Sequence, residues 1–217
     1  MRARGDYELG NFLGMDGAIE IWEATDLATG SALLVETLGN EVTGTSLSSS
    51  PLSREYRILS ALSHRGIPRP TGLRTDAAGT HTLVLDCGRS RESIREWVNG
   101  QPNHMEVEVW FKDLLLVIEY MHNRGVAHAR IGEAYVWAPS GAGDSESSAV
   151  LTGFADAFVS ADSMLPRSDG AALTDQVLPQ GLYGQDIAAA SELCARVLLR
   201  CVGGSESRCE LGEAIEA

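Results

Sequence analysis

Residues 7–38 have the sequence YELGNFLGMDGAIEIWEATDLATGSALLVETL, and this stretch decides the fold. Its apolar and β-branched residues gather in three short runs, a pattern typical of strands. The runs are residues 7–13, 19–25 and 32–38, and glycine-containing turns separate them. The stretch therefore predicts an antiparallel meander of three strands.

The chain after residue 38 predicts two more strands and then a mostly helical part. A helix begins near Pro51 and covers residues 53–62, where Tyr56, Leu59 and Leu62 share one face. The further predicted elements are strands at residues 69–74 and 81–86, a helix at 92–98, a long apolar helix at 105–122, short strands at 134–138 and 149–152, and a second apolar helix at 185–202. The predicted class is α+β, with a five-stranded antiparallel sheet, one helix inserted in it, and a helical remainder.

Composition and charge narrow the classes of partner. The 217 residues are 44% hydrophobic, which is enough for one packed domain. A formal net charge of −13 disfavours nucleic acid and anionic membranes, because both are negatively charged. No run approaches the roughly 18 apolar residues of a membrane span, and residues 1–9 lack the apolar core of a signal peptide. We therefore expect an intracellular chain, in the cytoplasm more than in the nucleus, with a protein as its partner.

The cysteines do not predict a metal centre. They are Cys87, Cys194, Cys201 and Cys209, and no two of them form a C-x-x-C pair. We expect reduced thiols and no metal site.

Short motifs follow one another along nearly the whole chain. Two of them are L-G-x-x-G-x-x-x-I-x-x-A-x-D at residues 13–26 and Y-M-H-x-x-G-V-x-H at residues 120–128. The others are R-E-x-x-I-L-x-x-L-x-H-x-x-I at 54–67, L-V-L-D at 83–86, L-T-x-F at 151–154 and G-x-D-I at 184–187. In this order the motifs resemble those of the protein kinase family over residues 7–204. Taken singly they have simpler explanations, such as turn glycines at Gly14 and Gly17.

The resemblance implies a two-lobed kinase-like fold for residues 1–217. It places the N-lobe at about 1–86, the hinge at about 86–90 and a shortened C-lobe at about 91–217. It also implies that the positions supporting the kinase architecture are kept. These positions are Glu55 of the regulatory helix, Leu59, His128 and Phe154 of the spine between the lobes, and Asp186, which anchors the spine by hydrogen bonds.

The positions at which kinases hold their reactive groups carry other residues. Glu36 stands where the resemblance implies a phosphate-binding lysine, and Gly153 where it implies a metal-binding aspartate. Arg130, Gly132 and Tyr135 stand in place of the catalytic base, a lysine and a metal-binding asparagine. An arginine cannot accept a proton, and tyrosine is a poor magnesium ligand. The resemblance therefore predicts a chain that is not an enzyme and that binds no Mg-ATP or other cofactor.

Two carboxylates are expected to approach each other in this region. In active kinases the strand lysine pairs with the helix glutamate, so Glu36 would here face Glu55. Two carboxylates about 4 Å apart repel by roughly 4 kcal/mol at an effective dielectric constant near 20. We therefore expect Glu36 to turn away or to pair with an arginine. Arg130 is one such arginine, although simple drift explains both residues as well.

Four further residues are expected to occlude the nucleotide site. Asp16 and Ile19 replace glycines of the phosphate loop, where the backbone of a kinase approaches phosphate. Leu34 and Trp137 replace smaller residues above and below the adenine base. The resemblance thus predicts a pocket filled by side chains.

The predicted function is that of a catalytically inactive pseudokinase acting as an interaction scaffold or an allosteric regulatory module. Helix 185–202 carries an apolar stripe that family members cover with further helices, so a protein partner or a second copy of the chain is expected there. The alternative is a residual nucleotide-binding or atypical kinase-like transferase. That activity needs a metal-binding carboxylate, for which Asp16 and Asp156 are the nearby candidates.

Overall fold

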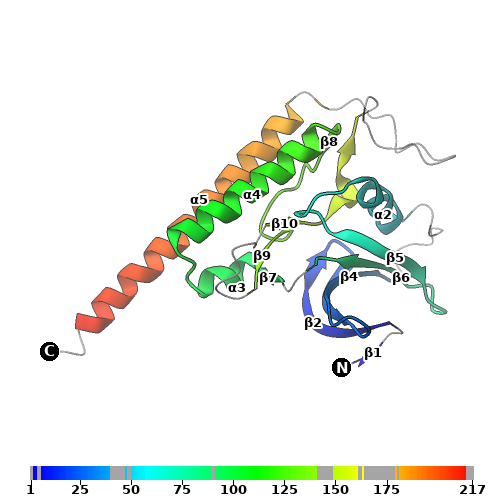
Figure 1. Ribbon diagram of the computed structural model, residues 1–217, viewed down its shortest axis with the longest axis horizontal. Helices are drawn as coiled ribbons and strands as arrows, with labels where there is room; N and C mark the ends of the chain where they lie inside the picture. Colours follow the sequence, from blue (N-terminus) through cyan, green and yellow to red (C-terminus); the bar gives the residue numbers. More distant parts are fainter. Residues whose placement is uncertain are drawn as a thin grey trace.

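The computed structural model describes residues 2–3, 6–39, 47, 50–88, 91–140, 149–160, 163, 179 and 181–213 of the chain. Within these residues the fold combines one large sheet with a group of helices (Figure 1). The predicted α+β class is therefore confirmed.

The large sheet is antiparallel throughout. Its strands are β1 (Arg2–Ala3), β2 (Tyr7–Asp16), β3 (Ile19–Asp26), β4 (Ala32–Leu38), β5 (Arg69–Thr75) and β6 (His81–Asp86). They lie in the order β1-β2-β3-β4-β6-β5, so the five predicted strands are present and β1 adds a two-residue edge. A sheet of this kind is consistent with the N-lobe of a kinase.

The two turns of the meander have clear local causes. In the β2–β3 turn Gly17 has a φ of 58°, a left-handed conformation that glycine adopts without a steric penalty. In the β3–β4 turn a carboxylate oxygen of Asp26 accepts the backbone N–H groups of Ala28 and Thr29 at 2.9 and 2.7 Å. These local interactions explain why the sequence pattern predicted the strand boundaries to within a few residues.

Helix α2 (Pro51–Ala61) is inserted between β4 and β5. It begins at Pro51, as predicted, because the Ser50 side chain caps it and proline is favoured at the first helical position. Its buried face includes Leu52, Ile58 and Leu59, and also the charged residue Glu55. The helix therefore brings one carboxylate into the core.

The described residues of the helical part form three helices. They are α3 (Ile94–Asn99), α4 (His104–His122) and α5 (Leu182–Glu213). Figure 1 shows α4 and α5 running side by side, away from the sheet. The predicted helix at 185–202 is shorter than α5, since the backbone stays helical through Gly203 and Gly204; a glycine weakens a helix by about 1 kcal/mol without forbidding it.

Within the described ranges between residues 91 and 160, short strands and a 3-10 turn connect the helices. They are β7 (Arg91–Ser93), β8 (Val126–Ala127), β9 (Val136–Pro139), β10 (Val150–Leu151), β11 (Phe158–Val159) and η2 (Phe154–Asp156). Strand β9 pairs with both β7 and β10, and β8 pairs with β11. The predicted helix at 92–98 therefore begins later, at Ile94, because the preceding residues extend to pair with β9.

One continuous apolar core joins the sheet to the helices. It runs from Leu34 on β4 through Leu59 on α2 and Phe154 on η2 to Trp110 on α4. A smaller cluster lies on the opposite face of the sheet and contains Tyr7, Ala24, Leu33, Val35 and Val84. The large core holds β4 and α2 against the segment around residue 154.

Of the helices in the described part of the chain, none has the length and apolar character needed to cross a bilayer.

Candidate functional site

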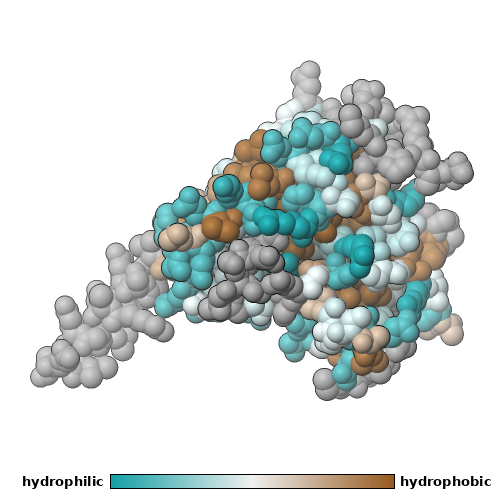
Figure 2. Space-filling view, viewed as in Figure 1, coloured by the Kyte–Doolittle hydropathy of each residue, from teal (hydrophilic) through white to brown (hydrophobic). Residues whose placement is uncertain are grey.

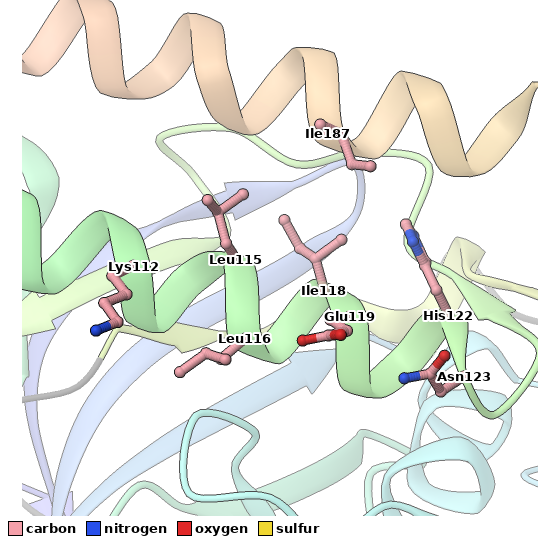
Figure 3. A pocket seen from close by; sticks show the side chains of 8 residues that line it. All are labelled: Lys112, Leu115, Leu116, Ile118, Glu119, His122, Asn123 and Ile187. Carbon is pink, nitrogen blue, oxygen red and sulfur yellow. The ribbon is translucent and has the colours of Figure 1, made fainter.

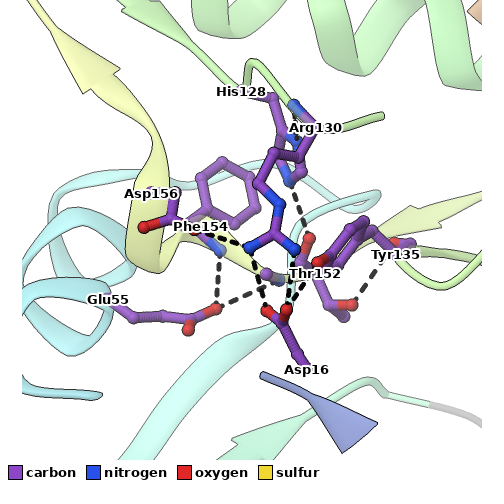
Figure 4. A network of polar contacts seen from close by, with 9 residues as sticks. Asp16, Glu55, His128, Arg130, Tyr135, Thr152, Phe154 and Asp156 are labelled. Carbon is purple, nitrogen blue, oxygen red and sulfur yellow. Dashed lines mark hydrogen bonds and ion pairs between the residues drawn. The ribbon is translucent and has the colours of Figure 1, made fainter. Parts of the chain in front are cut away.

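The predicted site residues come together where the sheet part meets the helical part (Figure 4). The sheet part contributes Asp16 at the end of β2, Glu36 on β4 and Glu55 on α2. The other side consists of the segments 128–137 and 152–156. The site is thus built from residues more than 100 positions apart in the sequence.

A network of polar side chains joins the sheet part to the helical part at this site. One guanidinium nitrogen of Arg130 lies 2.8 Å from a carboxylate oxygen of Asp16, and another lies 2.5 Å from Asp156. The Tyr135 hydroxyl donates to the same Asp16 oxygen at 2.7 Å. We refer to Asp16, Arg130, Tyr135 and Asp156 as the Arg130 latch.

The latch has a buried end and an exposed end. The side chain of Asp16 is 10% exposed and that of Asp156 is 62% exposed. Water screens the exposed ion pair with Asp156, so the ion pair with Asp16 contributes more to the stability of the fold. Burial and the hydrogen bond to Asp16 raise the pKa of the Tyr135 hydroxyl, which therefore stays protonated and continues to donate.

The loop that carries Arg130 is anchored from α5. Ala129 has a φ of 66°, a left-handed conformation that costs an alanine about 1–2 kcal/mol. The buried carboxylate of Asp186 accepts the backbone N–H groups of His128 and Ala129 at 2.9 and 2.8 Å, and the ring of His122 lies 3.0 Å from it. These hydrogen bonds hold the loop in its strained conformation and so place Arg130 within ion-pair distance of Asp16.

The predicted spine residues pack in the core beneath the latch. The rings of His128 and Phe154 are both fully buried, with centroids 5.1 Å apart and planes at 82°. A ring nitrogen of His128 lies 2.7 Å from the carbonyl oxygen of Thr152, and Leu59 belongs to the same core. Burial lowers the pKa of His128, so the neutral ring donates this hydrogen bond.

Glu36 does not behave as predicted. Among the described residues it forms no ion pair with an arginine, and it lies in the core near enough to Glu55 for that carboxyl group to raise its pKa. The β4 register explains the position, because Glu36 lies between Ile21 and Leu83 with every second residue facing the core. The prediction was wrong because it assumed that both carboxyl groups were ionised, whereas burial raises the pKa of each and so favours its neutral form.

Both members of this carboxyl pair are buried, Glu36 being 2% and Glu55 1% exposed. Burial raises the pKa of Glu36 well above its ordinary value, and the neighbouring Glu55 raises it further. Burial also raises the pKa of Glu55 to about 7, although the N–H groups of Phe154 and Gly153 lower it. One Glu55 oxygen accepts those N–H groups at 2.8 and 3.1 Å. Glu55 therefore ties α2 to the segment that begins at Gly153.

Two glycines of the site differ in the space around them. A Cβ atom at Gly153 would lie 2.2 Å from the Tyr135 ring, and the φ of Gly153 is 79°. The backbone of Gly132 is not left-handed, and a Cβ atom there would meet no atom within 4 Å. Tyr135 therefore requires a glycine at 153. The sequence pattern did not indicate this dependence, because the two residues lie in different segments.

Three of the four residues predicted to occlude a nucleotide are buried in the apolar core, whereas Asp16 belongs to the latch. Leu34 is 3%, Trp137 5% and Ile19 7% exposed. The indole N–H of Trp137 donates to the Thr152 hydroxyl at 3.0 Å. Within the described residues, no cluster of three or more His, Cys, Asp or Glu side chains could hold a metal ion.

A groove of about 380 Å³ lies away from the latch, between α4 and α5. Figure 3 shows Leu115 and Ile118 of α4 pointing toward α5, which contributes Ile187. Leu116 and Ile187 are 41% and 48% exposed, and apolar surface gathers over these helices in Figure 2. The lone lysine, Lys112, lines this groove and not the latch. Of the predicted apolar stripe on α5, Ile187 lines this groove, whereas Ala190, Cys194 and Val197 are buried in the core of the chain itself.

A second hollow of about 570 Å³ lies beside the segment 86–88. Its guanidinium groups include those of Arg65 and Arg69, which pair with Asp113 at 2.6 Å and with Asp86 at 2.8 Å. Their charges are already compensated within the chain.

Comparisons with known proteins relate the chain to kinases at a distance. No protein-family model matches it. It is 29% identical over 138 residues to CBL-interacting protein kinase 29 of Oryza sativa subsp. japonica, a match that covers 58% of this chain and 31% of that protein. It is 25% identical over 126 residues to CBL-interacting protein kinase 30 of the same plant, covering 57% of this chain and 26% of that one. The similarity supports a kinase-like relationship, and the matched region is about a third or less of each relative.

These relatives correct one prediction. Both are named protein kinases, which are enzymes. The comparison therefore contradicts the prediction that this chain is not an enzyme. The residues at Arg130, Tyr135 and Gly153 describe the geometry of the site and do not by themselves decide its activity.

Proposed function

We propose that the chain is a two-lobed kinase-like domain that acts as a protein-interaction scaffold and regulatory module. The N-lobe would comprise residues 1–86, the hinge 86–90 and the C-lobe 91–217. The antiparallel sheet with its inserted helix and the distant similarity to kinases support this architecture. The proposed location is inside the cell, in the cytoplasm more than in the nucleus.

The observation that carries the interaction role is the open apolar groove between α4 and α5. Its walls place Leu115, Ile118 and Ile187 around a hollow of about 380 Å³. Exposed Met105 and Val109 extend the apolar surface of α4, at 73% and 46% exposure. Covering exposed apolar surface releases water and favours association at about 25 cal/mol per Å².

The proposed occupant is an amphipathic helix of a protein partner, with a second copy of this chain as the competing occupant. An apolar helix face fits a groove between two helices. The net charge of −13 favours basic residues on the polar side of such a helix. The Arg130 latch supports the regulatory part of the proposal, because it joins the two parts of the chain across the mouth of the site.

Substitution of the groove tests this function. Leu116→Asp and Ile187→Asp place a charge in the groove, and Leu27→Asp is the matched control, since Leu27 is 55% exposed on a distant turn. Tagged forms of the chain are purified from the cells that produce it, and the copurifying proteins are compared by mass spectrometry. Light scattering on the purified chains reports self-association. We expect the groove variants alone to lose a specific partner or the dimer. Identical partners and identical mass for all four chains would overturn the proposal.

The second candidate function is that of a nucleotide-binding protein or kinase-like transferase, and the names of the relatives favour it. Asp16 and Asp156 are the carboxylates that could approach a metal, but both are bound to Arg130. The latch and the groove lie on different elements, so the chain can carry both functions. Phosphate transfer measured with Mg-ATP in the wild type and in Arg130→Ala tests this candidate. Turnover that changes with the variant would support it.

A further inference from the structure

We propose that the groove between α4 and α5 and the Arg130 latch are coupled through His122 and Asp186, so that a helix bound in the groove stabilises the latch. This coupling rests on the proposed function of the groove and is the means by which binding there regulates the site. Hydrogen bonds run from the groove wall to the loop that carries Arg130. His122 is a positioning residue, because it acts on Arg130 only through Asp186.

The groove wall reaches Asp186 directly. His122 of α4 and Ile187 of α5 both line the groove (Figure 3). The ring nitrogen Nε2 of His122 lies 3.0 Å from a carboxylate oxygen of Asp186, and it donates, because a carboxylate has no hydrogen to give. The His122 ring also packs on Tyr183 of α5, with ring centroids 4.2 Å apart. One side chain of the groove wall therefore holds α4 to the first turns of α5.

The carboxylate of Asp186 also holds the loop that carries Arg130. Its two oxygens accept the backbone N–H groups of His128 and Ala129, and the oxygen bonded to His128 is the one bonded to His122. Ala129 has a φ of 66°, a strained conformation that persists only where neighbouring groups impose it. A loop released by Asp186 would relax to an unstrained backbone and carry Arg130 out of the latch. The strained and relaxed loops are the two states between which binding can shift the chain.

Helix α5 holds the same segment at a second point. Two guanidinium nitrogens of Arg200 lie 3.0 and 3.1 Å from the two carboxylate oxygens of Glu133. These side chains are 46% and 32% exposed, so water screens this pair, and the contact at Asp186, which is 1% exposed, contributes more. Segment 128–133 is thus held from α5 near each of its ends. A change in how α5 packs on α4 is therefore transmitted to the segment.

A bound helix strengthens these contacts and does not break them. The His122 side chain is 13% exposed and Ile187 is 48% exposed, so an occupant of the groove covers both. Excluding water lowers the local dielectric constant and strengthens the hydrogen bond from His122 to Asp186. The strained loop is then held more strongly, and with it the ion pairs of Arg130. Coupling is reciprocal, so opening the latch weakens binding in the groove by the same factor.

A double-mutant cycle on the purified full chain measures the coupling without any partner. His122→Phe keeps an aromatic ring beside Tyr183 and removes the hydrogen bond to Asp186, and Arg130→Ala opens the latch. We expect Arg130→Ala to lower the melting temperature by about 2 °C at low salt in the wild type. In the His122→Phe background it should lower it by less than half as much, because the loop that positions Arg130 is already loosened.

The matched control for this cycle is His104→Phe, the same change at the exposed first residue of α4. In that background Arg130→Ala should cause its full shift. If the shifts also add in the His122→Phe background, His122 has only a structural role and the coupling is absent. A wild type whose melting temperature Arg130→Ala leaves unchanged would equally overturn the proposal, since the latch would then have no stability for the groove to increase.

A second measurement reads the coupling in the opposite direction and does not need the His122 variant to fold. Exchange of the His122 ring N–H with solvent is followed by nuclear magnetic resonance in the wild type, in Arg130→Ala and in Arg95→Ala, an exposed arginine on α3. We expect exchange to be at least about threefold faster in Arg130→Ala alone. Equal rates in the three chains would overturn the proposal. Neither experiment involves a partner, so their failure would leave binding in the groove standing, and loss of that binding would not alter either result.

Discussion

The Arg130 latch and the Glu36–Glu55 pair lie in the same site but handle charge in opposite ways. At the latch one arginine forms ion pairs with two aspartates, and the Asp156 end is open to water. At the pair, two carboxyl groups are buried in the core, neither forms an ion pair among the described residues, and burial raises the pKa of both. The comparison shows the effect of burial, because a charge near water can be paired at little cost, whereas a charge in the core is costly and the pKa of the group shifts toward its neutral form. Salt should therefore weaken the ion pairs of the latch, and the stability contributed by the Glu36–Glu55 pair should depend on pH.

The largest effect on stability is expected at Gly153, whose backbone lies against the Tyr135 ring of the latch. Gly153→Ala would place a Cβ 2.2 Å from the Tyr135 ring at a φ of 79°. We expect the free energy of unfolding to fall by about 2–4 kcal/mol, from the clash and the left-handed backbone. Chemical denaturation measures the change. Gly132→Ala is the control and should alter stability by less than about 0.5 kcal/mol, because its Cβ meets no neighbour within 4 Å. Equal effects at both glycines would show that Tyr135 does not pack as described.

The next effect concerns the hydrogen bonds that Glu55 accepts. Glu55→Ala leaves the N–H groups of Gly153 and Phe154 without their acceptor in a buried position. We expect a loss of about 2–3 kcal/mol in the free energy of unfolding. Glu55→Gln keeps an acceptor oxygen and should cost less than half as much. Hydrogen exchange at the Phe154 amide, which should accelerate only in the alanine variant, checks the cause. Similar losses in both variants would assign the effect to charge and not to the hydrogen bonds.

The smallest effect is expected at the latch itself. Arg130→Ala removes its ion pairs and should lower the free energy of unfolding by about 0.5–1 kcal/mol at low salt, and by less in 1 M salt. Asp156→Asn should cost less still, because that carboxylate is 62% exposed. Thermal melts at two salt concentrations measure both. A large loss that salt does not change would mean that Arg130 supports the core and not only the mouth.

Much of the fold was predictable because its causes are local. The strands of the meander and the helices at α2 and α4 follow from residue periodicity, turn glycines and caps such as Ser50 and Asn103. Strand β7 was not predicted. Its residues, Arg91–Ser93, have no apolar alternation and extend only because β9 offers a partner. An element of this kind depends on a residue far along the chain, which a local pattern cannot indicate.

The site was only partly predictable for the same reason. The kinase-like motifs indicated which residues would meet, including Glu36 with Glu55. They did not indicate that Arg130 would bind Asp16, because these residues are 114 positions apart and sequence patterns carry no distances. They also misled on Glu36, since its ionisation depends on its burial.

The sequence by itself determined the α+β class, the order of strands and helices, and the residue types present at each site position. Periodicity and turn chemistry act over a few residues, so they can be derived without coordinates. Only the tertiary structure decided that Asp16, Arg130 and Tyr135 form a latch, that Tyr135 needs a glycine at 153, and that Glu36 and Glu55 are both buried. The strength of a charge, a clash or a hydrogen bond depends on distance and burial, and both arise only when remote segments pack together.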